Sequence, residues 1–323
     1  MISEKVIREN IPTAIQTIKI KGLGKRQNGK VRDWFDKDGF RILIATDRIS
    51  AFDRVVGLIP FRGAILNKLS EYWFEKTRDI IANHMIGVVD PNVMLISHAS
   101  PIPIEVVVRA YITGVTDTSL WKQYSEGKRI IYGIKFTEGL KKNQKLAKPI
   151  ITPTTRATGK TGHDEPITKH EIIKSKVVSK SIWKQVENVA LKLFERSTKF
   201  AEKAGFILAD TKYEFGLDKR DKLVLIDEIH TPDSSRYWDK KTYQQKFRKG
   251  EEPENYDKEY MRLWFTKQGY SGRGKPPPMP QDLIVKISQR YMEVFERITG
   301  EKFQVDLSHD PRERIIESLS KII

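Results

Sequence analysis

Three polar residues alternate along one segment in the second half of this 323-residue chain. Asp210, Lys212 and Glu214 are each two positions apart, so in a β-strand they share one face at steps of about 7 Å. A polar turn, 217–222, leads into a second apolar run that ends on Asp227. If that turn centres on its third and fourth residues, Asp227 lies opposite Lys212 and diagonal to Glu214. Acids beside a lysine suit a hard cation and a polyphosphate; the alternative is a solvated polar face on a half-buried hairpin.

The loop after this hairpin, 231–236, has the sequence TPDSSR. It brings the hydroxyl of Ser235 and the guanidinium of Arg236 close to the same hairpin. Hydroxyls, backbone amides and a guanidinium together favour binding of an anion. The alternative is a surface arginine that pairs with Asp233 or Asp239.

Glycines and basic residues gather in 23–35, which we expect to form a β-hairpin that is followed by a strand at 40–47. Glycine lets backbone amides approach phosphate oxygens, and basic side chains neutralise them. The Walker pattern is absent, and basic hairpin turns are common, so an ordinary basic hairpin is the favoured alternative. The residues concerned are Gly24, Lys25, Arg26, Gly29, Lys30 and Arg32.

The segment 100–114 predicts a proline-stiffened entry into a buried, valine-rich strand that carries Arg109. A buried guanidinium needs a partner. Arg109 therefore either holds an anionic ligand or pairs with a structural carboxylate such as Glu105. Further along, His163 and Asp164 form a local pair in a turn-rich segment, and no serine elbow accompanies them, so a hydrolase triad is not indicated.

Longer elements must position these residues. Apolar periodicity predicts a helix over 63–77, a long amphipathic helix over 179–204 that stops at Gly205, and a terminal helix over 281–298. A charged segment, 239–260, and a proline-rich linker, 272–280, separate the last two.

The composition is that of a globular protein with 39% hydrophobic and 31% charged residues. It contains no cysteine, which excludes disulfides and thiolate chemistry. The net charge of +16 favours anionic partners, although scattered lysines also fit a merely solvated basic surface. We expect no secretory signal in the first residues and no membrane-spanning run.

Six motifs follow one another along the chain: NGKVRD (28–33), IATDRISAFD (44–53), PIEVVVRAYITG (103–114), TPTTRATGKTGHDEPI (152–167), LADTKYEFGLD (208–218) and LIDEIHTPDSSRYW (225–238). Together they resemble the longer form of the SAICAR synthetase family, which acts in de novo purine biosynthesis. The resemblance implies an α+β, two-lobed fold related to ATP-grasp and kinase-like nucleotide-binding folds. We expect residues 1–100 to form a mainly β lobe and residues 101–323 an α+β lobe.

The resemblance also implies a reaction. ATP, carboxyaminoimidazole ribotide (CAIR) and L-aspartate would give ADP, phosphate and SAICAR, with Mg²⁺, through an acyl phosphate. We expect a cytoplasmic monomer or small homo-oligomer that binds neither nucleic acid nor membrane. A small-molecule kinase on the same fold, or a basic nucleic-acid-binding protein, is the alternative.

Carried over motif by motif, the resemblance implies a role for each site residue. The metal ligands for Mg²⁺ would be Glu214 and Asp227, with Asp210 nearby. The nucleotide phosphates would face Lys212, Lys30, Arg32 and Arg156, and adenine would meet the backbone of the segment around Pro103 and Ile104. CAIR would be bound by Arg109, Arg236 and Ser235, and the CAIR or aspartate side of the site would be lined by Ser50 and Asp53. Lys212, Asp210 and Arg109 would be the catalytic group. One departure from the family is ITGVTDTSLW (112–121) in place of ITGS, so Ser119, Thr116 and Thr118 compete for one CAIR contact.

Overall fold

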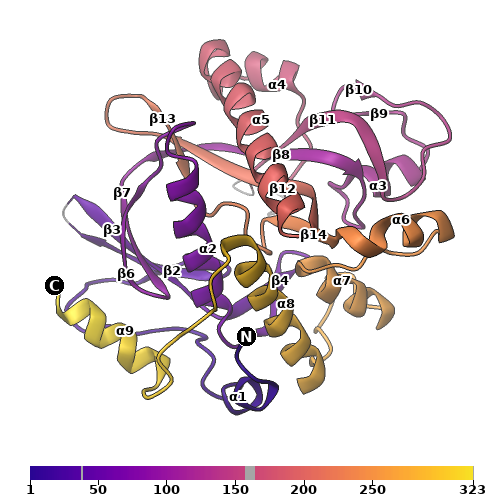
Figure 1. Ribbon diagram of the computed structural model, residues 1–323. Coiled ribbons are helices and arrows are strands. Elements are labelled where there is room, and N and C mark those ends of the chain that lie inside the picture. The colour runs from indigo at the N-terminus through magenta and orange to yellow at the C-terminus, as the bar shows by residue number, and fades with distance from the viewer. Residues whose placement is uncertain (38, 157–163, 323) are drawn as a thin grey trace.

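The computed structural model describes residues 1–37, 39–156 and 164–322, and its mixed helices and sheets confirm the α+β class. The first half of the chain builds an antiparallel sheet in the order β1-β2-β3-β7-β6 (Figure 1). The predicted basic hairpin forms its β1–β2 edge. The strands are β1 (Gln27–Asn28), β2 (Arg32–Lys37), β3 (Phe40–Ala45), β6 (Met85–Asp90) and β7 (Val93–Ser97).

A second antiparallel sheet follows, in the order β11-β8-β12-β13. Along one edge of β12, β14 pairs with the first half of the strand and β13 with the second half, while β8 pairs with the other edge. The strands are β8 (Ser100–Ile112), β11 (Gln144–Thr155), β12 (Phe206–Leu217), β13 (Leu223–Ile226) and β14 (Ser235–Asp239). Two small hairpins are separate from both sheets: β4 (Arg48–Ala51) with β5 (Arg54–Leu58), and β9 (Ile130–Ile131) with β10 (Ile134–Lys135).

The three predicted helices are present as α2 (Arg62–Lys76), α5 (Lys180–Lys203) and α8 (Gln281–Thr299). Some helices were not predicted, and the helix over 281–298, which was expected to be the terminal one, is not the last. The charged segment 239–260 contains α6 (Lys240–Lys249) and the start of α7 (Lys258–Lys267), and α8 is followed by α9 (Pro311–Ser320). In α6 only Tyr243 is buried, so the sequence of this helix lacks the apolar periodicity from which a helix can be predicted. The remaining helices are short: α1 (Glu4–Glu9), α3 (Leu120–Ser125) and α4 (Lys169–Lys174).

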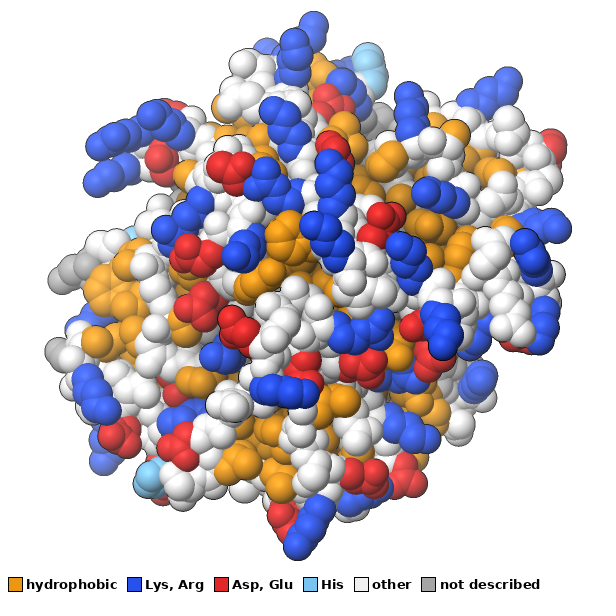
Figure 2. Space-filling model, in the orientation of Figure 1, with side chains coloured by type: hydrophobic (Ala, Val, Ile, Leu, Met, Phe, Trp, Pro, Cys, Tyr) orange, Lys and Arg blue, Asp and Glu red, His pale blue; other side chains and the backbone are white. Residues whose placement is uncertain are grey.

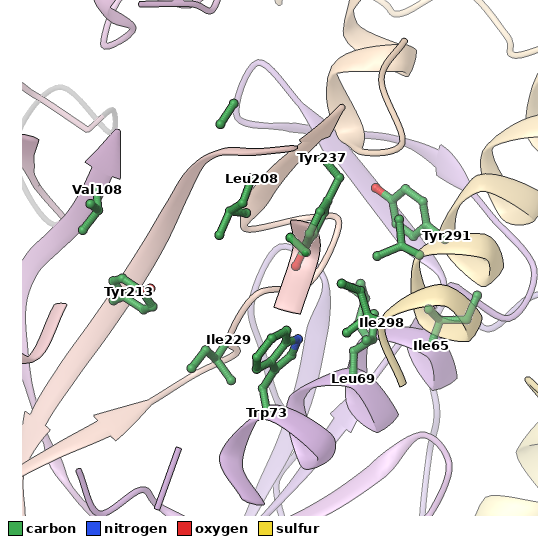
Figure 3. Close-up of a cluster of buried hydrophobic side chains, with 14 of the residues drawn as sticks. Ile65, Leu69, Trp73, Val108, Leu208, Tyr213, Ile229, Tyr237, Tyr291 and Ile298 are labelled. Atoms are coloured by element: carbon green, nitrogen blue, oxygen red, sulfur yellow. The ribbon is translucent and has the colours of Figure 1, made fainter. Parts of the chain in front are cut away.

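One large hydrophobic cluster joins the helices to the second sheet. Trp73 of α2, Tyr213 of β12, Tyr237 of β14 and Tyr291 of α8 are all fully buried (Figure 3). The core therefore fixes β12 by its inner face and leaves its outer face available for polar residues.

The predicted lobe boundary at residue 100 falls between the last strand of the first sheet and β8. However, α9 returns to pack against β6, and α8 packs against α2 (Figure 1). The division into two lobes therefore stays a prediction. Among the helices described, none is long and apolar enough to span a membrane.

Candidate active site

A cavity of about 740 Å³ opens between the two sheets. The first sheet contributes the β1–β2 turn and Leu43, the second sheet contributes the outer face of β12, and α7 and the β4–β5 turn complete the walls. The polar face of β12 is the one predicted: Asp210, Lys212 and Glu214 line the cavity. The intervening side chains, such as Tyr213, are in the core. A cavity of this size has room for a nucleotide and further small substrates.

Asp227 reaches this cavity by a different route from the one predicted. The observed register pairs Glu214 with Ile226, one residue away from the pairing predicted. With regular alternation, this register would point Asp227 to the core face of the sheet rather than to the face of Glu214. However, β13 ends at Ile226, and Asp227 adopts a left-handed backbone with φ +66°. Leu225 also bonds to Ala82 and His84 beside the first sheet. The chain leaves the strand at Asp227, whose carboxylate then lines the cavity.

Paired charges surround Asp227 and Glu214. Arg32 bridges Asp227 and Glu228, with both N–O distances at 2.5 Å. Lys212 lies 2.7 Å from Glu214 and 2.8 Å from Glu105. The side chain of Arg156 lies 3.3 Å from Glu214.

The pKa directions of the two acids differ. Burial raises the pKa of Glu214, and the charges of Asp227 and Glu105 add to the rise, although Lys212 opposes it. Burial would also raise the pKa of Asp227, but Arg32 and Lys212 outweigh burial and lower it. The negative charge of Asp227 thus helps to raise the pKa of Glu214, and an added cation would relieve that repulsion.

At the other end of β12, Asp210 lies between two arginines. Its Oδ2 is 3.1 Å from Arg109 Nη1 and 2.6 Å from Arg236 Nη1. The alternative of a structural carboxylate partner for Arg109 is confirmed, but that partner is Asp210 and not Glu105. The surface alternative for Arg236 was wrong, because Arg236 is buried and pairs with Asp210 rather than with Asp233 or Asp239. Two guanidinium groups hold Asp210, so a metal role for Asp210 stays a prediction, with Glu214 and Asp227 as the principal candidate pair.

Most of the hydroxyl residues expected at the site line the cavity. Ser50, Thr116, Thr118 and Ser235 line the cavity, as does Asp53, which lies 2.5 Å from Lys30. The Ser235 hydroxyl also lies 2.7 Å from that of Thr211 in the strand beside it.

Ser119 is not among the lining residues. It is buried at the N-terminus of α3, and its hydroxyl bonds to Thr116. A Cβ on Gly114 would lie 2.5 Å from Ser119 Cβ and 3.0 Å from Arg236 Nη2. Ser119 therefore packs behind the cavity wall, and Thr116 and Thr118 are the hydroxyls that remain for a CAIR contact.

Pro103 and Ile104 are not among the residues that line the cavity, although Pro101 and Glu105 of the same strand do line it. The Pro103 carbonyl accepts the Arg156 backbone N–H, and the Ile104 side chain is in the core. The apolar walls come instead from Val31, Leu43, Ile96 and Ile226. Residues 157–163, including His163, lie outside the described part of the chain.

Sequence reasoning missed a second charged cluster. Asp233 bonds to Arg62 at 2.6 Å, to Lys258 at 2.7 Å and to the Tyr291 hydroxyl at 2.9 Å. Arg262 lies one helical turn beyond Lys258, and both line the cavity. Their spacing of four within 258–267 was the available signal, but the segment was read only as charged.

The carboxylates of the cavity supply only part of a coordination shell for Mg²⁺. Among the residues that the structure describes, no group of three or more acids or histidines has the spacing of a complete metal site. Mg²⁺ does not need one, because it keeps several waters and is commonly held by one or two carboxylates together with phosphates. Glu214 and Asp227, which repel each other, fit this partial donor set.

A two-sheet α+β fold with acids and many cations around one cleft defines an enzyme that acts on phosphorylated anionic substrates. The SAICAR synthetase family model matches residues 25–277. The chain is 47% identical to phosphoribosylaminoimidazole-succinocarboxamide synthase of Legionella pneumophila strain Paris, over 92% of this chain and 95% of that protein. It is 43% identical to the chloroplastic enzyme of Arabidopsis thaliana, over 94% of this chain and 74% of that protein.

Solved structures agree. SAICAR synthase from Saccharomyces cerevisiae in complex with SAICAR aligns with a TM-score of 0.77 and 33% identity, over 90% of this chain and 100% of that one. A type-2 SAICAR synthetase in complex with ADP aligns with a TM-score of 0.66 and 26% identity, over 87% and 100%. The chain belongs to the SAICAR synthetase family.

Proposed function

We propose that this protein catalyses the ATP-dependent ligation of L-aspartate to the carboxylate of CAIR, giving SAICAR, ADP and phosphate. One observation carries the proposal: a single cavity combines the acid pair of Glu214 and Asp227 with the arginine pair around Asp210. The acid pair, with Lys212 and Arg32, suits a nucleotide triphosphate. The arginines suit an anionic second substrate.

The chemistry begins with the CAIR carboxylate. An oxygen of that carboxylate attacks the γ-phosphorus of ATP, which releases ADP and forms an acyl phosphate. The aspartate amine then attacks the acyl carbon, and phosphate leaves with the original carboxylate oxygen. Phosphoryl transfer needs mainly positioning and charge neutralisation, which Lys212, Arg32, Lys30 and Arg156 would supply on the nucleotide side.

Glu214 and Asp227 would hold Mg²⁺, which when bound would neutralise phosphate charge. Arg32 and Lys212 contact these same carboxylates in the structure. In this proposal the two side chains move from the acids to the phosphates when nucleotide enters. Adenine would lie against the apolar wall of Val31, Leu43 and Ile226 rather than at Pro103 and Ile104.

The decisive assay follows ADP release with ATP and CAIR, in the presence and absence of L-aspartate. We expect stoichiometric, sustained release of ADP and phosphate only when L-aspartate is added. A small-molecule kinase would release ADP without an amine acceptor. Sustained ADP release with CAIR that is indifferent to aspartate would therefore refute the ligase.

The acyl phosphate makes a separate prediction. With oxygen-18 in the CAIR carboxylate, we expect one labelled oxygen in each phosphate released during aspartate turnover, measured by mass spectrometry of the phosphate. Unlabelled CAIR in labelled water is the control and should give unlabelled phosphate. Phosphate without label from labelled CAIR would rule out the acyl-phosphate route.

Charge alone suggested nucleic acid as an alternative partner. On the face seen in Figure 2, Lys and Arg are dispersed among Asp and Glu rather than gathered into one stripe. This pattern favours a solvated basic surface, and the cations that carry chemistry are those inside the cavity. The cytoplasmic location and the monomeric or small homo-oligomeric state stay predictions.

A further inference from the structure

A small hydrophobic core lies behind the wall of the cavity that carries Thr116 and Thr118. Helix α3 and the β9–β10 hairpin pack together beside β8 and β11, separately from the main hydrophobic cluster (Figure 1). The loop 114–119 joins β8 to α3 and presents Thr116 and Thr118 to the cavity. The buried residues of the small core are Ile112, Leu120, Tyr124, Ile131, Tyr132 and Phe136.

Tyr132 of the small core has a strained backbone. Because Ile131 pairs with Ile134, the β9–β10 hairpin has a two-residue turn, and φ is +54° at Tyr132 and +76° at Gly133. Turns of this type favour Asn, Asp or Gly at both positions, and a bulky residue with positive φ is an outlier. Such strain persists where surrounding contacts compensate for it, and it concentrates at functional sites. The outlier therefore indicates a role for the tyrosine side chain.

The hydroxyl of Tyr132 makes the compensating contact. The side chain is buried, and its hydroxyl donates a hydrogen bond of 2.6 Å to the backbone carbonyl of Thr118. The same carbonyl accepts a longer bond, 3.3 Å, from Nη2 of Arg109. Tyr132 therefore makes the shorter of the two bonds that tie this carbonyl to the rest of the protein.

The loop 114–119 also contacts both arginines that flank Asp210. Arg109 reaches the Thr118 carbonyl, and Nη2 of Arg236 would lie 3.0 Å from a Cβ on Gly114. Inside the loop, the backbone N–H of Ser119 donates to the Thr116 carbonyl at 2.9 Å. This internal bond shapes the loop, whereas the bonds to the Thr118 carbonyl set its position against the two guanidinium groups.

We propose that Tyr132 is a positioning residue for ribotide binding: its hydroxyl holds the loop 114–119 so that Thr116, Thr118 and the two arginines form one ordered anion site. The inference rests on the proposed function, in which Arg109 and Arg236 bind CAIR. Tyr132 is not among the residues that line the cavity, so it acts only through the loop. Binding donors that are already ordered avoids the entropy cost of ordering them when the ligand arrives.

The first test is hydrogen exchange of the free protein, because it needs no substrate. Tyr132→Phe removes the hydroxyl and leaves the ring in the small core. Loss of one neutral hydrogen bond shifts a local opening equilibrium by about 3- to 10-fold. Amide exchange in a peptide that spans 114–121, measured by mass spectrometry, should therefore become at least about 3-fold faster in Tyr132→Phe.

The second test is a separation of kinetic constants. Tyr132→Phe should raise the KM for CAIR about 3- to 10-fold, the range set by one neutral hydrogen bond. The KM values for ATP and L-aspartate, and kcat with all substrates saturating, should change less than about 2-fold. This pattern is expected because the loop contributes to binding of the ribotide and not to the chemical steps.

Tyr124→Phe is the matched control. It removes a tyrosine hydroxyl from the same small core, where that hydroxyl donates to the Thr137 carbonyl at 2.9 Å and accepts the Leu140 N–H at 3.1 Å. Tyr124→Phe should lower the thermal unfolding temperature at least as much as Tyr132→Phe. It should leave the exchange of 114–121 and the KM for CAIR at their wild-type values. A merely stabilising role of Tyr132 would give the two variants the same profile.

The outcomes separate this inference from the proposed function. Wild-type protein without aspartate-dependent ADP release would refute the proposed function, and the role of Tyr132 in ribotide binding with it. With an active wild type, an unchanged KM for CAIR in Tyr132→Phe would overturn the inference alone. Unchanged exchange of 114–121, or equal rises in all three KM values, would overturn it as well.

Discussion

Asp227→Asn is expected to lower turnover at least about 100-fold, because stabilisation of transition-state charge around a phosphoryl group is worth several kcal/mol. The substitution removes one of the two carboxylates proposed to hold Mg²⁺ while it preserves size. Asparagine also tolerates the left-handed backbone found at this position. Arg32 keeps its contact with Glu228, so the fold should be retained.

The measurement is the rate of ADP release at saturating substrates over a Mg²⁺ titration, with thermal unfolding to confirm the fold. Asp221→Asn is the matched control: it neutralises an exposed acid in the turn of the same hairpin, also at a left-handed position. Asp221→Asn should keep wild-type turnover. Near-wild-type turnover of Asp227→Asn at saturating Mg²⁺ would count decisively against this site.

Arg236→Lys is expected to raise the KM for CAIR at least about 10-fold and the KM for ATP much less, since it keeps the charge but loses the planar fork. Arg236 connects Asp210 to Glu259 and has a buried Nε without a partner among the described residues. A lysine can satisfy only part of this geometry. Arg109 still neutralises Asp210, which should preserve the strand pairing.

Initial rates with CAIR and ATP varied in turn separate the two constants. Arg248→Lys, on the exposed face of α6, is the control and should change neither of them. If the CAIR constant of Arg236→Lys stays at the wild-type value, Arg236 is a structural member of the buried charge network and not a ligand.

Local patterns determined much of the outcome. The alternation of Asp210, Lys212 and Glu214 placed them on one face, because side chains of any strand alternate and the apolar set between them must be buried. The periodicity of α5 and α8 was equally readable, since each buries a continuous apolar stripe. Helix α2 is instead buried on most sides, polar residues such as Asn67 and Ser70 included. The motif blocks determined the family.

Only the tertiary structure decided which charges meet. The sequence alone did not decide which carboxylate pairs with Arg109, whereas the pairing of β8 with β12 places Asp210 directly opposite Arg109. Asp227 reached the cavity through a positive φ that no periodicity encodes. Lys258 meets Ser50 because α7 packs against β4. The local sequence pattern determines which side chains of a strand or helix face the core. The partner of a buried charge depends instead on how distant segments pack, because only that packing brings two charges together and removes them from water.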